Sequence, residues 1–223
     1  MVRMTPQHLA FVCTDPFSWS FKKKKKPYEG CRKTFAKILE VVSMQVKQNI
    51  PITTYYVMKP MEISPQRTLL LDELHAFLLE LSENPLLHEH KIKISILGKW
   101  YDLPSKLIDV IKTLIDDTKE YDEYFVNFCI NYDGHEEIVD ACKMVARRVK
   151  LGRIAVEAVN TDSIKDDLYS SYFLPPDVIF IPGDRKRLES FLLWDSVDAT
   201  LAFVEKEFAD LTVKEILKET KRK

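Results

Sequence analysis

Paired cysteines, excess charge and long apolar runs are all lacking in this sequence of 223 residues. Its four cysteines show no Cys-x-x-Cys spacing, which argues against a disulfide framework and against a zinc ribbon. A formal net charge of −1 argues against a dedicated nucleic-acid binder. No apolar run approaches the roughly 18 residues of a membrane span, and the N-terminal residues lack the apolar core of a signal peptide. We therefore expect a reduced, cytoplasmic protein with no nucleic-acid partner.

Apolar residues are plentiful, at 46% of the chain, and they occur in short runs that alternate with helical patterns. Runs rich in β-branched or aromatic residues predict strands at residues 8–13, 52–58, 92–97, 124–132 and 178–181, with a sixth at 201–204. Helical spacing fills residues 28–48, 65–81, 104–118 and 136–151, and a polar loop with a short helix is expected over residues 161–176. This alternation predicts one α/β domain over residues 1–223, with a sheet of roughly six mainly parallel strands flanked by helices.

Glycine is rare enough for its positions to be informative. Four of the five glycines fall at predicted strand ends or helix starts: Gly30, Gly98, Gly134 and Gly183. Glycine is needed where the backbone bends sharply or approaches a ligand closely. Because open parallel sheets bind ligands beyond the carboxyl ends of their strands, we expect the functional site at that edge.

Residues 177–195, DVIFIPGDRKRLESFLLWD, are the most informative stretch. An apolar run leads into a Pro-Gly-Asp turn, then a basic cluster, then a Phe-Leu-Leu-Trp block. This order predicts a buried strand that carries positive charge to a loop beside the sheet edge. Such a loop suits an anionic ligand.

The same stretch takes part in a resemblance that extends over nearly the whole chain. Cis-prenyltransferases, the undecaprenyl and dehydrodolichyl diphosphate synthases, carry an Arg and then Phe-Leu-Leu-Trp near their C-terminus, as residues 187–194 do here. Residues 8–15, HLAFVCTD, stand where that family reads H-x-A-I-I-M-D. Residues 127–141, NFCINYDGHEEIVDA, resemble its N-x-A-L-N-Y-G-G-R-x-E-I-x-x-A. The resemblance implies the cis-prenyltransferase fold and a Mg²⁺-dependent reaction that elongates an allylic diphosphate with isopentenyl diphosphate.

Several polar residues of the family's site are replaced in this chain. The metal-binding Asp of the D-G-N-G-R motif aligns with Thr14, and Asp15 follows one place later. The Glu that completes the family's metal site aligns with Thr200. One diphosphate-binding arginine persists as Arg187, but Glu189 stands where the family has a Ser, and we expect it to neutralise Arg187. The resemblance therefore implies no catalytic residue and no metal site in this chain.

These losses predict a non-catalytic or weakly catalytic subunit, similar to the Nogo-B receptor type, which pairs with a catalytic cis-prenyltransferase homologue to make long-chain polyprenyl diphosphate. Mg²⁺ would then act with the catalytic partner. Lys26, Arg32 and Arg187 are the residues expected to bind a prenyl diphosphate. Residues 191–194 are expected to form the apolar interface with the partner. Residues 221–223 depart from the Arg-x-Gly ending of such subunits.

Two other functions stay open. An active, divergent cis-prenyltransferase would use Asp15 as metal ligand, with Lys26, Arg32 and Arg187 as its cationic residues. A prenyl-lipid binding module without a transferase partner is the third hypothesis. The helix at residues 65–81 is apolar nearly all round, which fits either a cavity for the lipid or a packed core.

Four features have an ordinary structural interpretation beside a functional one. The lysine run at residues 22–26 is expected to be a solvated loop, or else to grip a diphosphate or a membrane surface by peripheral contact. His88 and His90 lack a third ligand nearby in the sequence and are expected to be an exposed pair. Cys31, at a helix start, is expected to be a packed thiol. Asp15 would equally serve as a helix or turn cap.

Overall fold

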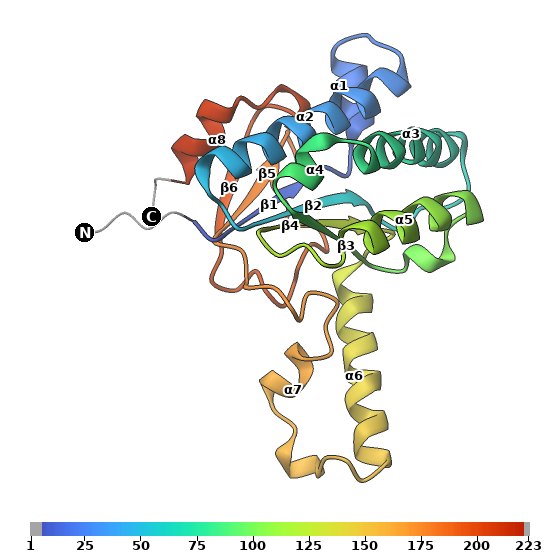
Figure 1. Cartoon of the computed structure of the whole chain (residues 1–223), viewed down its shortest axis with the longest axis vertical. Coiled ribbons are helices and arrows are strands. Elements are labelled where there is room, and N and C mark those ends of the chain that lie inside the picture. Colours follow the sequence, from blue (N-terminus) through green and yellow to red (C-terminus); the bar gives the residue numbers. More distant parts are fainter. Residues whose placement is uncertain (1–5, 221–223) are drawn as a thin grey trace.

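The computed structural model describes residues 6–220, which form one α/β domain around a sheet of six parallel strands (Figure 1). The strands lie in the order β3-β4-β2-β1-β5-β6, and each neighbouring pair is parallel. Their bounds are β1 His8–Val12, β2 Ile52–Met58, β3 Ile92–Leu97, β4 Tyr124–Ile130, β5 Val178–Pro182 and β6 Thr200–Val204. The predicted fold class is confirmed, and all six predicted runs form strands.

The central strands are buried on both faces, which explains their continuous apolar character. All seven residues of β2 are buried. Leu9 of β1 pairs in register with Thr53 of β2 and with Val178 of β5. This register aligns the carboxyl ends of β1, β2 and β5 at one edge of the sheet, so the loops that leave these strands meet there.

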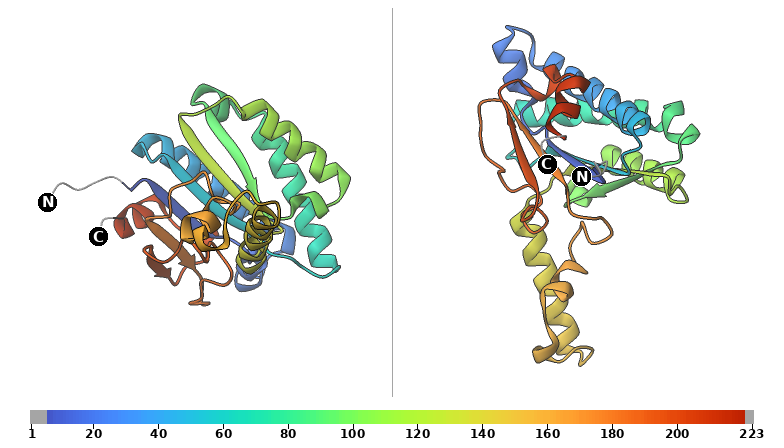
Figure 2. Two further views of the ribbon diagram at one scale, coloured as in Figure 1. Left: turned by 90° about the horizontal axis from the view of Figure 1, so that it is seen from below. Right: turned by 90° about the vertical axis from the view of Figure 1, so that its left-hand side faces the viewer.

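Three long helices cover one face of the sheet (Figures 1 and 2): α2 Pro27–Gln48, α3 Pro65–Ser82 and α5 Ser105–Thr118. α3 begins where the Ser64 side chain accepts a hydrogen bond from the Arg67 amide. Phe35 of α2 stacks on Phe77 of α3, with ring centroids 4.7 Å apart. Phe77 also meets Phe128 of β4 edge to face. The apolar helix predicted at residues 65–81 therefore packs, through Phe77, against aromatic side chains of α2 and β4.

A fourth long helix, α6 Gly134–Lys150, projects from the other side of the sheet, and α7 Thr161–Lys165 returns beside it (Figures 1 and 2). We call residues 134–170 the arm. α6 begins two residues before its predicted start because the Asp133 side chain accepts a hydrogen bond from the His135 amide. Arg148 and Asp167 join the two halves of the arm, with nitrogen and oxygen 2.6 Å apart.

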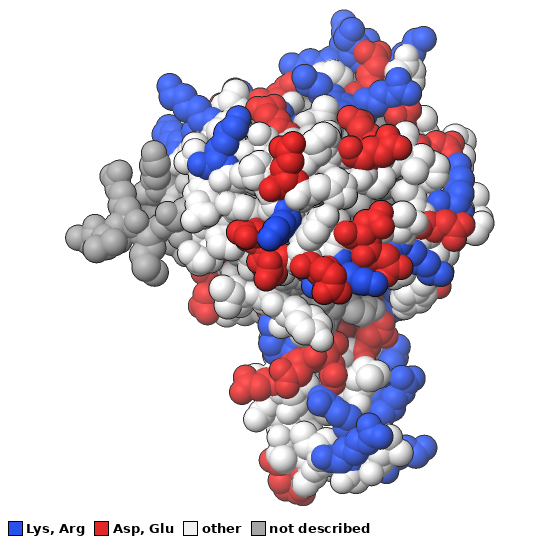
Figure 3. Space-filling view, viewed as in Figure 1, with Lys and Arg blue, Asp and Glu red and all other residues white. Residues whose placement is uncertain are grey.

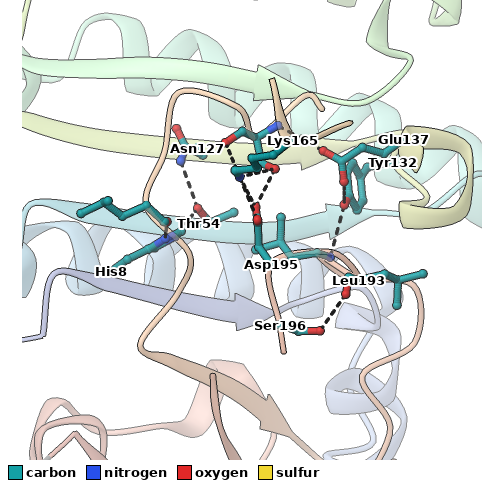
Figure 4. A network of polar contacts seen from close by, with 12 residues as sticks. His8, Thr54, Asn127, Tyr132, Glu137, Lys165, Leu193, Asp195 and Ser196 are labelled. Atoms are coloured by element: carbon teal, nitrogen blue, oxygen red, sulfur yellow. Dashed lines mark hydrogen bonds and ion pairs between the residues drawn. The ribbon is translucent and has the colours of Figure 1, made fainter. Parts of the chain in front are cut away.

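A buried polar network ties the arm to the sheet (Figure 4). The Lys165 ammonium lies 2.7 Å from a carboxylate oxygen of Asp195, and the Ser170 hydroxyl donates to the same oxygen. Glu137 accepts a hydrogen bond from the hydroxyl of Tyr132, and burial raises the pKa of Glu137. Because the loss of one member would leave a buried charge or polar group unpaired, this network fixes the base of the arm.

Residues 191–194 lie partly in the core, which corrects the prediction that they form an exposed interface. Phe191 is fully buried and stacks on Tyr56 of β2, with centroids 5.1 Å apart. Leu192 is buried in the same cluster, and the other two side chains are half-buried. The sheet face needs Phe191 and Leu192 to cover it, so neither side chain is available to a partner.

Three short helices and three 3₁₀ turns in residues 6–220 complete the fold: α1 Pro16–Lys22, α4 Pro85–Glu89, α8 Val213–Glu219, η1 Trp100–Asp102, η2 Val156–Ala158 and η3 Phe208–Asp210. Helix α1 was not predicted from the sequence. The lysine run is therefore only partly a loop, because Lys22 ends α1 and residues 23–26 form the turn into α2. None of the helices in the described part of the chain is long and apolar enough to cross a membrane.

Candidate functional site

A cavity of about 130 Å³ lies at the carboxyl ends of β1 and β5. Its lining comes from the end of β1 with the start of α1, from the loop that follows β5, and from η3. The β5 loop also carries the basic cluster, residues 185–187. The cavity therefore occupies the edge of the sheet that glycine placement and strand order had indicated.

Gly183 and Gly30 allow close approach in two different ways. Gly183, in the cavity wall, has a φ of 86°, which disfavours other residues, and an added Cβ would lie 3.1 Å from a carboxylate oxygen of Glu207. At Gly30 an added Cβ would lie 2.1 Å from the carbonyl oxygen of Pro16. Gly30 therefore lets α2 pack tightly on α1, which is a structural role.

Asp15 lies in the cavity wall, but its carboxylate already has two partners. One oxygen caps α1 by accepting a hydrogen bond from the Ser18 amide at 3.1 Å. The other lies 3.4 Å from a guanidinium nitrogen of Arg185. The capping interpretation is confirmed, and the ion pair means that a cation at Asp15 would compete with Arg185.

Glu189 is the central anion of the cavity. Its carboxylate lies 3.8 Å from Arg185 and 3.8 Å from Lys59, and it accepts a hydrogen bond from the Thr14 hydroxyl at 3.4 Å. The expectation that Glu189 neutralises Arg187 is wrong, because the Glu189 carboxylate forms its ion pairs with Arg185 and Lys59 instead. Glu189 has a φ of 57°, and a left-handed backbone costs a residue with a side chain roughly 1–2 kcal/mol. Strain of this kind persists only where the surroundings hold it, here through contacts of the carboxylate.

A second ion cluster closes one side of the cavity. The Lys22 ammonium lies 2.6 Å from Asp184 and 2.6 Å from Glu207. Hydrogen bonds to Asp184 and then to Glu207 raise the pKa of Lys22. Glu207 also accepts a hydrogen bond from the Ser18 hydroxyl at 3.1 Å. The end of α1 is thereby joined to the β5 loop and to the segment that leads into η3.

The three predicted diphosphate residues do not converge. Arg187 is exposed and lines the cavity, and no carboxylate in residues 6–220 forms an ion pair with it. Arg32 instead makes two hydrogen bonds, of 2.8 and 3.0 Å, to Glu73 of α3. Lys26 is exposed at the start of α2, where its amide donates to Glu29. Diphosphate binding by Lys26, Arg32 and Arg187 stays a prediction, and Arg187 alone of the three lines the cavity.

Thr200 lies at the opposite end of the sheet from Thr14, which lines the cavity. It is the first residue of β6 and pairs with Val178, the first residue of β5, whereas the cavity lies beyond the carboxyl end of β5. At about 3.3 Å per residue, the length of β5 separates the two positions by more than 10 Å. The two positions aligned with metal-binding carboxylates are therefore not brought together within this chain.

The cavity residues do not fit Mg²⁺. Mg²⁺ needs oxygen ligands in near-octahedral geometry. Asp15, Glu189 and Glu207 all line the cavity, yet each is held by a Lys or Arg. In the described part of the chain no three His, Cys, Asp or Glu side chains are grouped as a metal site. His88 instead contacts the Tyr121 hydroxyl and the carbonyl of residue 82.

Several residues of the site were missed by the sequence analysis. Lys59 follows β2 at the same sheet edge, so strand order alone could have indicated it. Arg185 lies in the same basic cluster as Arg187. No motif or spacing in the sequence indicated Glu207, although it lines the cavity. Cys31 is buried, and desolvation raises its pKa to about 12, which confirms a packed, unreactive thiol. The departure at residues 221–223 lies outside the described residues.

Comparisons with known proteins agree with this architecture. The family model described as "Putative undecaprenyl diphosphate synthase" matches residues 18–222. A tritrans,polycis-undecaprenyl-diphosphate synthase (geranylgeranyl-diphosphate specific) of Methanopyrus kandleri is 26% identical over 203 residues, which are 90% of this chain and 75% of that protein. Isoprenyl transferase 2 of Corynebacterium efficiens is 27% identical over 217 residues, which are 95% of this chain and 87% of that protein.

A solved structure shares the fold. Lavandulyl diphosphate synthase from Lavandula x intermedia, in complex with dimethylallyl diphosphate, superposes with a TM-score of 0.92. The match covers 98% of this chain and 96% of that chain, at 20% sequence identity. At this identity the likeness establishes the fold alone.

Proposed function

Because the chain belongs to the undecaprenyl diphosphate synthase family of cis-prenyltransferases, we propose that it is a non-catalytic subunit of a heteromeric cis-prenyltransferase. It would pair with an active homologue that makes long-chain polyprenyl diphosphate. The observation that carries this proposal is the position of Glu189, which lines the cavity and whose carboxylate lies near Thr14, Lys59 and Arg185.

The Glu189 carboxylate would compete with a bound diphosphate for the same cations. A diphosphate is bound by charge-assisted hydrogen bonds from Lys, Arg and hydroxyl groups. In this cavity those groups already face an internal carboxylate. A diphosphate would have to displace Glu189 from Lys59 and Arg185, and it would then lie beside an unpaired negative charge. These contacts favour a cavity that binds diphosphate much more weakly than a catalytic site must.

The carboxylates of the cavity support the same conclusion. Asp15 caps α1 and faces Arg185, and Glu207 is held by Lys22. A Mg²⁺ ion would have to break these contacts before it gained a ligand. In this proposal Mg²⁺ therefore acts with the catalytic partner, and this chain contributes no metal ligand.

Arg187 favours a second candidate function, the binding of a prenyl diphosphate without turnover. It is an exposed cation at the cavity, with no carboxylate partner in residues 6–220. The active-enzyme alternative gains less support, because it also requires Arg32, which Glu73 holds on the surface of α2 and α3. Weak binding of diphosphate at Arg187 is compatible with the subunit function and would not by itself give catalysis.

The arm supplies the surface that a partner would need. Four large apolar side chains on it or at its turn are exposed by 43–66%: Val139, Met144, Leu151 and Val156. A projecting element that carries several exposed apolar side chains offers area that a protein partner could cover. We place the partner contact here instead of at residues 191–194, two of which the core uses.

Co-purification tests the proposal. The full chain would be co-expressed with a homologue from the same cells that retains the D-G-N-G-R motif, with an affinity tag on the homologue only. We expect the two chains to elute together in gel filtration and the homologue to gain activity or product length. Two separate chains, each eluting as alone, would contradict the subunit function, whatever the diphosphate affinity of this chain.

A further inference from the structure

The turn between α1 and α2 forms a projecting tip. α1 and α2 lie side by side and are joined by residues 23–26, which stand at the top of the molecule in Figure 1. Lysine and arginine side chains gather at this end of the molecule (Figure 3). We call Phe21 with Lys24, Lys25 and Lys26 the basic tip.

The lysines of this run divide into two groups. Lys22 and Lys23 are neutralised by carboxylates of the body, namely those at residues 184, 207 and 210. Lys24 and Lys26 are exposed, and neither forms an ion pair with a carboxylate in residues 6–220. Lys25 is 4.0 Å from Glu29, whose other oxygen accepts from the Lys26 amide. The tip therefore keeps a local excess of positive charge in a chain whose net charge is −1.

Phe21 gives the tip an apolar group. Its side chain is 86% exposed. Phe17 and Trp19 on the same helix behave differently, since Phe17 packs on the core and the Trp19 indole donates to Asp210. An exposed aromatic ring beside unpaired lysines is typical of segments that bind at the headgroup level of a bilayer.

We propose that the basic tip binds the surface of membranes that contain anionic phospholipids. Lys24, Lys25 and Lys26 would contact lipid phosphates, while the Phe21 ring enters the boundary between headgroups and acyl chains. A soluble diphosphate in the cavity would not explain these residues, because none of the four lines it. The inference does not depend on the proposed subunit function, because it concerns only this chain and a bilayer.

Vesicle sedimentation tests the basic tip. The full chain would be mixed with vesicles of phosphatidylcholine containing phosphatidylserine and with vesicles of phosphatidylcholine alone. We expect binding to the anionic vesicles only, weakening as salt rises. Each lysine near an anionic surface contributes about a fivefold change in affinity, so replacing Lys24, Lys25 and Lys26 by Gln should weaken binding about 100-fold. Phe21→Ser should weaken it at least several-fold with the charge unchanged.

A matched control replaces three exposed lysines that lie elsewhere, Lys47, Lys112 and Lys214, by Gln. This variant has the same net charge as the triple variant of the tip and should bind as the parent does. Equal loss in the control would show a general charge effect and overturn the proposal. No binding to anionic vesicles, equal binding to neutral vesicles, or full binding by Phe21→Ser would also overturn it. Release of bound protein by millimolar pyrophosphate at constant ionic strength would instead indicate a site for soluble phosphates.

Discussion

Replacing Glu189 by Gln should increase the affinity of the cavity for pyrophosphate. The change keeps the shape of the side chain and its hydrogen bond from Thr14, and it removes the charge that faces Arg185 and Lys59. Each of these two pairs spans 3.8 Å. At that distance a pair of unit charges interacts by about 1 kcal/mol when water screens it, and exposed pairs measure between about 0 and 1 kcal/mol.

The side chain of Arg185 is 63% exposed and that of Lys59 is 45% exposed, so the lower part of that range applies to each pair. The total competition removed is then about 0.5–1 kcal/mol. This corresponds to pyrophosphate binding that is roughly 2- to 5-fold tighter in Glu189→Gln. Titration calorimetry at low salt measures it directly, without need for a partner or for turnover.

Two further variants make this test specific. Glu120→Gln changes the charge equally at an exposed position after α5, far along the chain from the cavity, and should leave the affinity unchanged. Arg187→Ala combined with Glu189→Gln should lose most of the gain, because Arg187 is the exposed cation at the cavity. An affinity of Glu189→Gln that equals that of the parent would refute the argument that this carboxylate competes with a diphosphate.

Three other outcomes follow from the structure. Burial lowers the pKa of His8 from 6.5 to about 4, so the folded state binds a proton at this side chain less readily than the unfolded state does. The free energy of unfolding should therefore be full above pH 6.5 and fall by about 3 kcal/mol as the pH drops toward 4. Denaturant titrations of His8→Gln should lack this decline. Asp195→Asn leaves the half-buried ammonium of Lys165 without its carboxylate partner and should cost about 2 kcal/mol, seen as a lower melting temperature. The double change Val139→Asp with Met144→Asp should abolish co-purification with the catalytic homologue, whereas Ile63→Asp, at a more exposed apolar residue on the body, should retain it.

The sheet was predictable because its strands are short β-branched or aromatic runs that are bounded by Pro, Gly, Asp or Lys. The short helices were harder. In α1 the Asp-Pro start was visible, but the lysine run that follows Phe21 favoured a loop. The start of α6 lies two residues before the predicted one because the local cap at Asp133, not the apolar pattern, sets where that helix begins, whereas α3 begins at Pro65 as predicted.

The site was predictable only in part, because sequence order fixes which loops meet but not which charges pair. The sheet edge was correct, and Arg187 and Asp15 do lie there. The predicted partner of Glu189 was wrong, because Arg185 and Lys59 form ion pairs with its carboxylate and Arg187 does not. Arg32 is of a residue type that binds diphosphates, yet its guanidinium forms an ion pair with Glu73 of the neighbouring helix α3.

Isopentenyl diphosphate incorporation by the purified chain alone tests the central claim most directly. The assay would supply Mg²⁺, labelled isopentenyl diphosphate and geranylgeranyl diphosphate, for which the relatives from Methanopyrus kandleri and Pyrococcus furiosus are named as specific. Because no carboxylate of the cavity is available to a metal and Glu189 faces the cationic groups, we predict no elongated product from this chain, and elongation once the catalytic homologue is added. Mg²⁺-dependent elongation by the chain alone, abolished by Asp15→Ala, would contradict the account.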